Sequence, residues 1–189
     1  MKSGKEIIGV LCLGMVMAGL LVVQSCKKDD DDAAPSCTKE VADTRLNVPA
    51  VRLTTDSLLI VQYLEDHDIT GTDIKHNVRY KIHELGTGET PCLESYIKAK
   101  YRGSLLKSGY VFEPDQETQP NVNWQEREVD FLLSDLIVGW QIVLSSVPVG
   151  TKLTLYIPSG YGFGVSGGRG GLVPVNAPLI FEIELLSIN

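Results

Sequence analysis

Segments in which apolar and polar residues alternate constrain the fold of this chain more than any other feature. They cover residues 78–83, 97–102, 128–133, 151–157 and 179–185, with a shorter extended piece at 110–112. A period of two places one face of a strand against a core and the other face toward water. Polar turns such as GTGETP separate these segments, so we expect an antiparallel sheet with one buried face.

One segment between these strands has helical periodicity. Four apolar residues in it share a single helical face, at spacings i, i+3, i+4 and i+7: Trp140, Val143, Leu144 and Val147. Ser134 or Asp135 is expected to cap this helix, and Pro148 with Gly150 to end it. The strands and the short helix together predict an α+β fold in which one face of the sheet packs on the helix.

A second helix is predicted ahead of the sheet, over residues 56–66. The segment is mostly apolar, and Thr55 or Asp56 is a candidate for its N-cap. Its pattern leaves two roles open, because the helix could pack on the domain or mediate dimerisation.

The first 26 residues have the pattern of an export signal. Lys2 and Lys5 precede an apolar run from Ile7 to Val23, and the sequence VQSC ends at Cys26. The run could also serve as a membrane anchor, but a small residue directly before a cysteine is typical of lipoprotein cleavage. We therefore expect a lipoprotein signal peptide over residues 1–25. A lipid on Cys26 would then anchor the mature protein to the outer membrane of a Gram-negative envelope.

The stretch CKKDDDDAAPSC follows, and we expect an acidic flexible tether over residues 26–50. Lysines and aspartates after the cysteine also resemble a surface-export signal of some Gram-negative lipoproteins. Calcium binding by Asp29 to Asp32 is a third option, although a flexible run has no preorganised ligand cage. Cys12 lies in the signal peptide. Cys37 and Cys92 could pair in an oxidising envelope, and two cysteines do not establish a bridge.

The glycine-rich stretch YGFGVSGGRGGLVP matches two catalytic patterns. G-x-G-x-x-G binds a dinucleotide between a strand and a helix, but the prolines that follow prevent a helix here. G-x-S-x-G would make Ser166 a nucleophile, yet all three histidines precede it, whereas that fold places its histidine after the serine. We therefore expect neither nucleotide binding nor hydrolysis, and no cofactor.

Metal and nucleic-acid sites are not indicated. His67, His76 and His83 lack ligand spacing, and HExxH is absent. DHDITGTDIKHN begins like a calcium loop but has Asn77 where a bidentate glutamate is required. The net charge is −7, and no dense basic cluster is present, which argues against nucleic-acid binding.

Four motifs, in order along the chain, resemble the FKBP-type peptidyl-prolyl cis-trans isomerases. They are the YRG after the second strand, LIVGW, PVGTKLTLYIPSGYGFG and NAPLIFEIELL. The resemblance runs from about Val78 to Ile188, which places an FKBP-type domain over 76–189 and an N-terminal helical extension over 51–75. It implies a twisted antiparallel sheet wrapped around one short helix, and isomerisation of X-Pro bonds in envelope proteins.

The resemblance also assigns an apolar pocket with Trp140 as its floor. Catalytic roles would fall on Tyr101, Phe112, Glu113, Ile137, Trp140, Phe163 and Phe181. Substrate-binding roles would fall on Val129, Leu136 and Val173.

Three of these positions depart from the family. Family members usually have aspartate where Glu113 stands, often an aromatic residue where Val129 stands, and tyrosine where Phe163 stands. The tyrosine hydroxyl donates to a ligand carbonyl, so Phe163 keeps the apolar wall and removes that donor. An alternative function follows, in which the fold binds peptides or serves an envelope complex with weak or no isomerase activity. The sequence does not indicate an oligomeric state.

Overall fold

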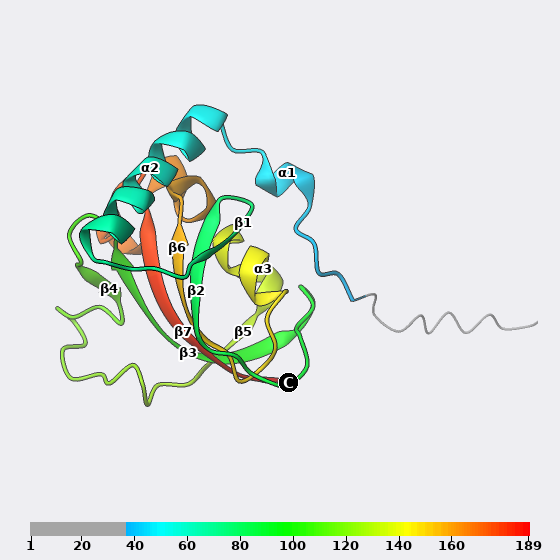
Figure 1. Ribbon diagram of the computed structural model, residues 1–189. Helices are drawn as coiled ribbons and strands as arrows, with labels where there is room; N and C mark the ends of the chain where they lie inside the picture. The colour runs from blue at the N-terminus through cyan, green and yellow to red at the C-terminus, as the bar shows by residue number, and fades with distance from the viewer. Residues whose placement is uncertain (1–36) are drawn as a thin grey trace, which may run out of the picture. The chain divides into compact units, whose positions relative to one another are not determined.

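Within residues 37–189, the part of the chain that the computed structural model describes, seven antiparallel strands form one sheet that curves around helix α3 (Figure 1). The strands are β1 (Asp73–Lys75), β2 (Val78–Glu84), β3 (Tyr96–Leu105), β4 (Val111–Glu113), β5 (Val129–Leu132), β6 (Lys152–Ile157) and β7 (Leu179–Ile188). Their order is β1-β2-β6-β7-β3-β4, and β5 pairs with β3. The α-helices are α1 (Asp43–Leu46), α2 (Ala50–Asp66) and α3 (Val138–Leu144).

The alternating segments form strands as predicted, and their register explains which side chains enter the core. Leu155 of β6 lies opposite Phe181 of β7, and both are buried in the cluster that packs on α3. Their neighbours Tyr156 and Ile180 point to the other face of the sheet, because side chains alternate along a strand. Strand β1 was not predicted, since its sequence, DIK, contains a single apolar residue.

Helix α3 forms within the predicted segment, but it ends at Leu144, before Val147 and the expected stop at Pro148 and Gly150, and it does not have the predicted N-terminal cap. Ser134 and Asp135 lie in a separate 3-10 helix, Leu133–Asp135, and Ile137 occupies the N-cap position without a side-chain hydrogen bond. The fully buried Gln141 holds the preceding turn instead. Its side-chain amide donates to the carbonyl oxygens of Ser134 at 2.8 Å and Leu136 at 2.6 Å.

Helix α2 begins at Ala50, six residues before the predicted start, and the expected caps are wrong. Thr55 and Asp56 lie inside the helix, and Asp56 is buried. Ile60 and Leu64 pack with Tyr156 and Ile180, residues of the sheet face opposite α3. The helix therefore packs on the domain.

Residues 37–50 are attached to the domain rather than forming part of the flexible tether expected over 26–50. Cys37 and Cys92 form a disulfide, with their Cα atoms 5.1 Å apart. The Ser145 hydroxyl donates to the Lys39 carbonyl oxygen at 2.7 Å, and Val41 is buried. These contacts hold the chain along the domain as far as Cys37.

The expected signal peptide, the lipidation site Cys26 and the acidic residues Asp29–Asp32 lie outside the described residues. Among the helices of residues 37–189, none combines the length and the apolar character needed to cross a membrane.

Candidate active site

An apolar cavity of about 150 Å³ opens between α3, the sheet and the long connection from β6 to β7. We call this connection, residues 158–178, the flap. The cavity is lined by Tyr101, Phe112, Glu113, Phe131, Leu136, Ile137, Trp140, Phe163, Arg169 and Phe181. Most of these side chains are aromatic or aliphatic, so the site suits a small apolar group.

Trp140 lies at the centre of an aromatic cluster. It is 2% exposed, and its ring lies edge-on to Tyr101 at 5.2 Å and to Phe181 at 5.3 Å between centroids. Phe112 meets Phe181 in the same geometry at 5.7 Å. Edge-to-face contacts of this kind hold aromatic rings in fixed orientations. The cluster therefore presents a rigid apolar surface to the cavity.

A glycine in β3 makes this close packing possible. Gly103 is paired with Phe181 in β7 and with Glu113 in β4. A Cβ atom at this position would lie 2.7 Å from the Phe181 ring and 2.8 Å from the Phe112 ring, too close for either to stay in place. The YRG motif thus contributes its glycine to the shape of the pocket.

The flap carries Phe163 to the cavity. Phe163 is half-buried, and its ring lies edge-on to Phe112 at 6.2 Å. A Cβ atom on Gly168 would lie 2.4 Å from the Phe163 ring, and Gly167 has a φ of +65° beside the Val173 carbonyl. The glycines therefore serve close approach and left-handed turns, which other residues adopt at a cost. The flap contains short 3-10 helices in place of the helix that a dinucleotide loop requires, and Ser166 is exposed.

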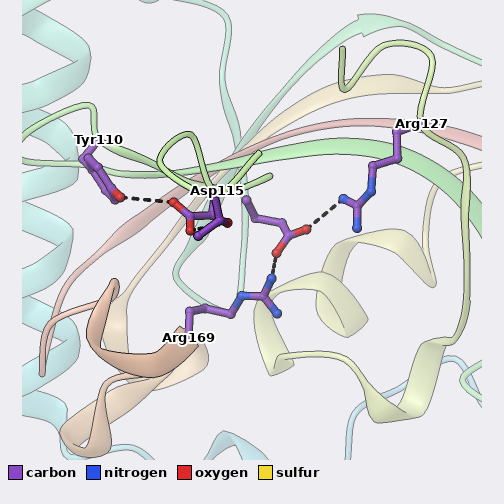
Figure 2. A network of polar contacts seen from close by, with 6 residues as sticks. Tyr110, Asp115, Arg127 and Arg169 are labelled. Atoms are coloured by element: carbon purple, nitrogen blue, oxygen red, sulfur yellow. Dashed lines mark hydrogen bonds and ion pairs between the residues drawn. The ribbon is translucent and has the colours of Figure 1, made fainter. Parts of the chain in front are cut away.

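Glu113 places a carboxylate in the apolar lining, and two arginines hold it. It ends β4 and is 4% exposed. Arg127 donates from Nη1 to Oε1 at 2.8 Å, and Arg169 contacts Oε2 through Nη2. Figure 2 shows Arg127 and Arg169 reaching the carboxylate from different loops. The Arg127 guanidinium also lies 5.7 Å from the centre of the Tyr101 ring.

Asp115 organises the start of the loop that leads to Arg127. Its carboxylate accepts hydrogen bonds from the Thr118 hydroxyl at 2.7 Å and the Glu117 N–H at 3.1 Å, and these bonds lower its pKa. The Tyr110 hydroxyl lies 3.4 Å from the same carboxylate (Figure 2). Burial, together with the nearby acidic groups, raises the pKa of Tyr110.

The structure brings eight of the ten expected site residues to the cavity. All seven residues expected to be catalytic line it, together with Leu136. Val129 and Val173 do not: Val129 is half-buried in β5 opposite Ala99, and Val173 is buried in the main core.

Two lining residues were not predicted. Phe131 lies two residues beyond Val129 in the alternating strand, so both face the same side, and this spacing could have identified it. Arg169 is the one charged residue in the sequence of the flap, but no local pattern links it to Glu113.

Within residues 37–189, no group of three or more histidine, cysteine, aspartate or glutamate side chains is arranged to hold a metal ion. The His83 Nε2 instead lies 2.8 Å from the Thr154 hydroxyl, on the neighbouring strand.

Comparison with known proteins identifies one family. Residues 88–186 match the family FKBP_C, described as FKBP-type peptidyl-prolyl cis-trans isomerase. The FK506-binding protein 1 of Eremothecium gossypii is 32% identical over 118 residues, which cover 61% of this chain and 96% of that protein. The outer membrane protein MIP of Legionella longbeachae is 29% identical over 112 residues, 59% of this chain and 44% of that protein.

A solved structure has the same fold. A peptidyl-prolyl cis-trans isomerase from Pseudomonas syringae aligns with a TM-score of 0.59 at 25% identity, covering 74% of this chain and 94% of that one. The chain spans less than half the length of several curated bacterial relatives that it matches, between 38% and 47%.

Proposed function

The chain belongs to the FKBP-type peptidyl-prolyl cis-trans isomerase family, and we therefore propose that its aromatic pocket isomerises X-Pro bonds in polypeptides. One observation carries the proposal: Tyr101 and Phe181 pack edge-on against Trp140 around a small apolar cavity. Bond rotation needs no nucleophile or metal ion, because no covalent bond is made or broken.

The barrier to be lowered is that of amide rotation, about 18–20 kcal/mol, which arises from resonance in the planar peptide bond. The planar amide is charge-separated, and an apolar pocket disfavours it relative to the twisted form. In the proposed arrangement Trp140 and Phe181 contact the proline ring. The carbonyl of the preceding residue faces Tyr101, Phe112 and Glu113. The backbone N–H of Ile137, at the start of α3, would donate to a carbonyl of the bound peptide.

The experiment that tests this proposal measures cis-trans exchange of an X-Pro peptide by NMR with the purified protein. Phe181→Ala should lower the exchange rate about tenfold or more, because it removes apolar contact with the twisted form. Ile180→Ala is the matched control, since Ile180 is the preceding residue of β7 and packs under α2 on the opposite face of the sheet. An unchanged rate in a folded Phe181→Ala protein would contradict the pocket assignment.

A second function is favoured by one observation. Phe163 lines the cavity without a hydroxyl, so the pocket has one donor fewer than the family pattern supplies. The alternative is therefore a peptide-binding or envelope-complex module with weak or no isomerase activity. Peptide binding without accelerated exchange would favour this alternative.

We place the protein at the envelope of a Gram-negative bacterium, held on the outer membrane by a lipid on Cys26. The apolar run that ends in VQSC supports this location, as does the name of the Legionella longbeachae relative, an outer membrane protein. The Cys37–Cys92 disulfide is also typical of an oxidising compartment. Mass spectrometry of the mature protein should find a lipid on Cys26 as its N-terminal residue; an unmodified Cys26 would contradict the lipid anchor.

A further inference from the structure

Two guanidiniums, those of Arg127 and Arg169, contact the one carboxylate that lines the pocket. We propose that the pocket selects X-Pro segments whose residue before the proline is acidic, and that Arg169 is the residue that determines this specificity. The inference rests on the proposed isomerase activity of the same pocket and adds a class of substrate to it.

The first step is the charge balance around Glu113. This carboxylate is almost fully buried, and each of its oxygens contacts a different guanidinium, that of Arg127 or that of Arg169. One negative charge therefore faces two positive charges. Arg127 pairs with Glu113 from outside the cavity lining, so the second guanidinium, that of Arg169, is the cation that the lining itself presents.

The second step is that the guanidiniums keep donors for a ligand. A guanidinium has five N–H donors, and each arginine contacts Glu113 through a single Nη atom. The Arg169 side chain is 47% exposed and lines the cavity, whereas that of Arg127 is 32% exposed. Arg169 can therefore contact Glu113 and a second carboxylate together, and guanidinium–carboxylate pairs are well matched in geometry.

The third step is that the flap holds Arg169 in place. Its φ is +54°, a left-handed conformation that residues other than glycine rarely adopt, and Gly170 and Gly171 continue the turn with φ values of +66° and +98°. Leu172 closes this turn by donating its N–H to the Arg169 carbonyl at 3.3 Å. Such a conformation persists where the surrounding structure determines it.

The fourth step is the position of the substrate residue. In the proposed mechanism the carbonyl of the residue that precedes proline faces Tyr101, Phe112 and Glu113. The side chain of that residue branches from the Cα atom next to this carbonyl, which brings it within reach of the Arg169 guanidinium in the same lining. An acidic side chain would pair with the Arg169 guanidinium, and a lysine there would be repelled by it.

The test compares peptides that differ at one position, with glutamate, glutamine or lysine before the proline, and measures kcat/KM for exchange. The parent protein should favour glutamate over glutamine about two- to fivefold, the range of a solvent-exposed ion pair. Added salt should reduce this preference. Arg169→Gln should bring the ratio close to one, and Arg169→Lys should keep most of it.

The control is Arg79→Gln, which removes the same charge from β2, outside the residues that line the cavity. It should leave the preference unchanged. Equal rates for glutamate and glutamine peptides in the parent would overturn the inference. So would an Arg169→Gln protein that is slower on all peptides by the same factor, because Arg169 would then only hold the flap closed.

Calorimetric binding of the same peptides separates this inference from the proposed function. If no peptide exchanges faster, the isomerase proposal fails, and a lower Kd for the glutamate peptide that Arg169→Gln abolishes would still support the charged rim. Equal Kd values for the three peptides would overturn the selectivity whatever the exchange rates are.

Discussion

Asp56 and Ser159 form a buried link between helix α2 and the start of the flap. The Asp56 Oδ2 accepts hydrogen bonds from the Ser159 N–H at 2.8 Å and from its hydroxyl at 2.5 Å. Both residues are fully buried, and Arg52 lies 3.8 Å from the other carboxylate oxygen. Ser159 begins the 3-10 helix that precedes Phe163. Helix α2 thus holds the first turn of the segment that covers the pocket.

Asp56→Ala should destabilise the protein by about 3 kcal/mol. The substitution leaves the buried Ser159 N–H and hydroxyl without their acceptor, and hydrogen bonds to charged groups are among the stronger ones. Denaturant unfolding measures the change. Glu65→Ala, which removes an exposed carboxylate of the same helix, should change stability by no more than about 0.5 kcal/mol. Equal effects of the two substitutions would show that the link contributes nothing.

Phe163→Tyr should raise kcat/KM for X-Pro exchange about two- to tenfold. The added hydroxyl would donate to a substrate carbonyl, and a typical net hydrogen bond is worth about 0.5–1.5 kcal/mol. The ring should keep its place, because the added hydroxyl does not replace its packing contacts with Phe112 and Gly168. A rate at or below that of the parent protein would mean that no acceptor lies within reach.

Reduction of the Cys37–Cys92 disulfide should lower the free energy of unfolding by about 4 kcal/mol. The bond closes a loop with a sequence separation of 55, and the loss of its constraint on the unfolded chain gives this magnitude. The measurement is denaturant unfolding with and without reductant. The variant in which both cysteines are replaced by serine should be as unstable as the reduced protein and insensitive to reductant. A parent protein that is equally stable in reductant would contradict the prediction.

Tyr156 should make stability fall at alkaline pH. Burial of its hydroxyl, with smaller contributions from Tyr63 and Glu182, raises its pKa to about 12, from about 10 in an unfolded chain. The folded state therefore favours the protonated phenol. This contribution is fully present below pH 10 and is lost as the pH rises from 10 toward 12. The free energy of unfolding, measured across this pH range, should fall more steeply with pH in the parent protein than in Tyr156→Phe. The exposed Tyr96→Phe should follow the parent.

Most of the fold could be predicted because its signals are local. The alternation of Leu153, Leu155 and Ile157 and the helical spacing of Trp140 and Val143 each depend on a few neighbouring residues. Helix boundaries were less accurate. Aspartate is a common N-cap residue, so Asp56 was expected to cap the helix. It instead accepts a hydrogen bond from Ser159, which lies far along the chain.

Much of the pocket could be predicted from motifs that the chain shares with a family, but its charged rim could not. Family members often have an aromatic residue at the position of Val129. In this chain Phe131, two residues farther along β5, lines the cavity instead. Arg169 stands among glycines without a periodic or motif signal. It reaches Glu113 because the flap turns back over β4.

The sequence by itself determined six of the seven strands, the apolar face of α3 and five of the six aromatic residues that line the pocket, since each follows from spacing within one segment or from a motif. Only the tertiary structure decided that residues 37–50 lie along the domain, that Asp56 of α2 is buried against Ser159, and that one carboxylate is shared by two arginines. The physical reason is the same in all three cases. Contacts between polar groups distant in sequence depend on where the chain turns back, and no local period records them.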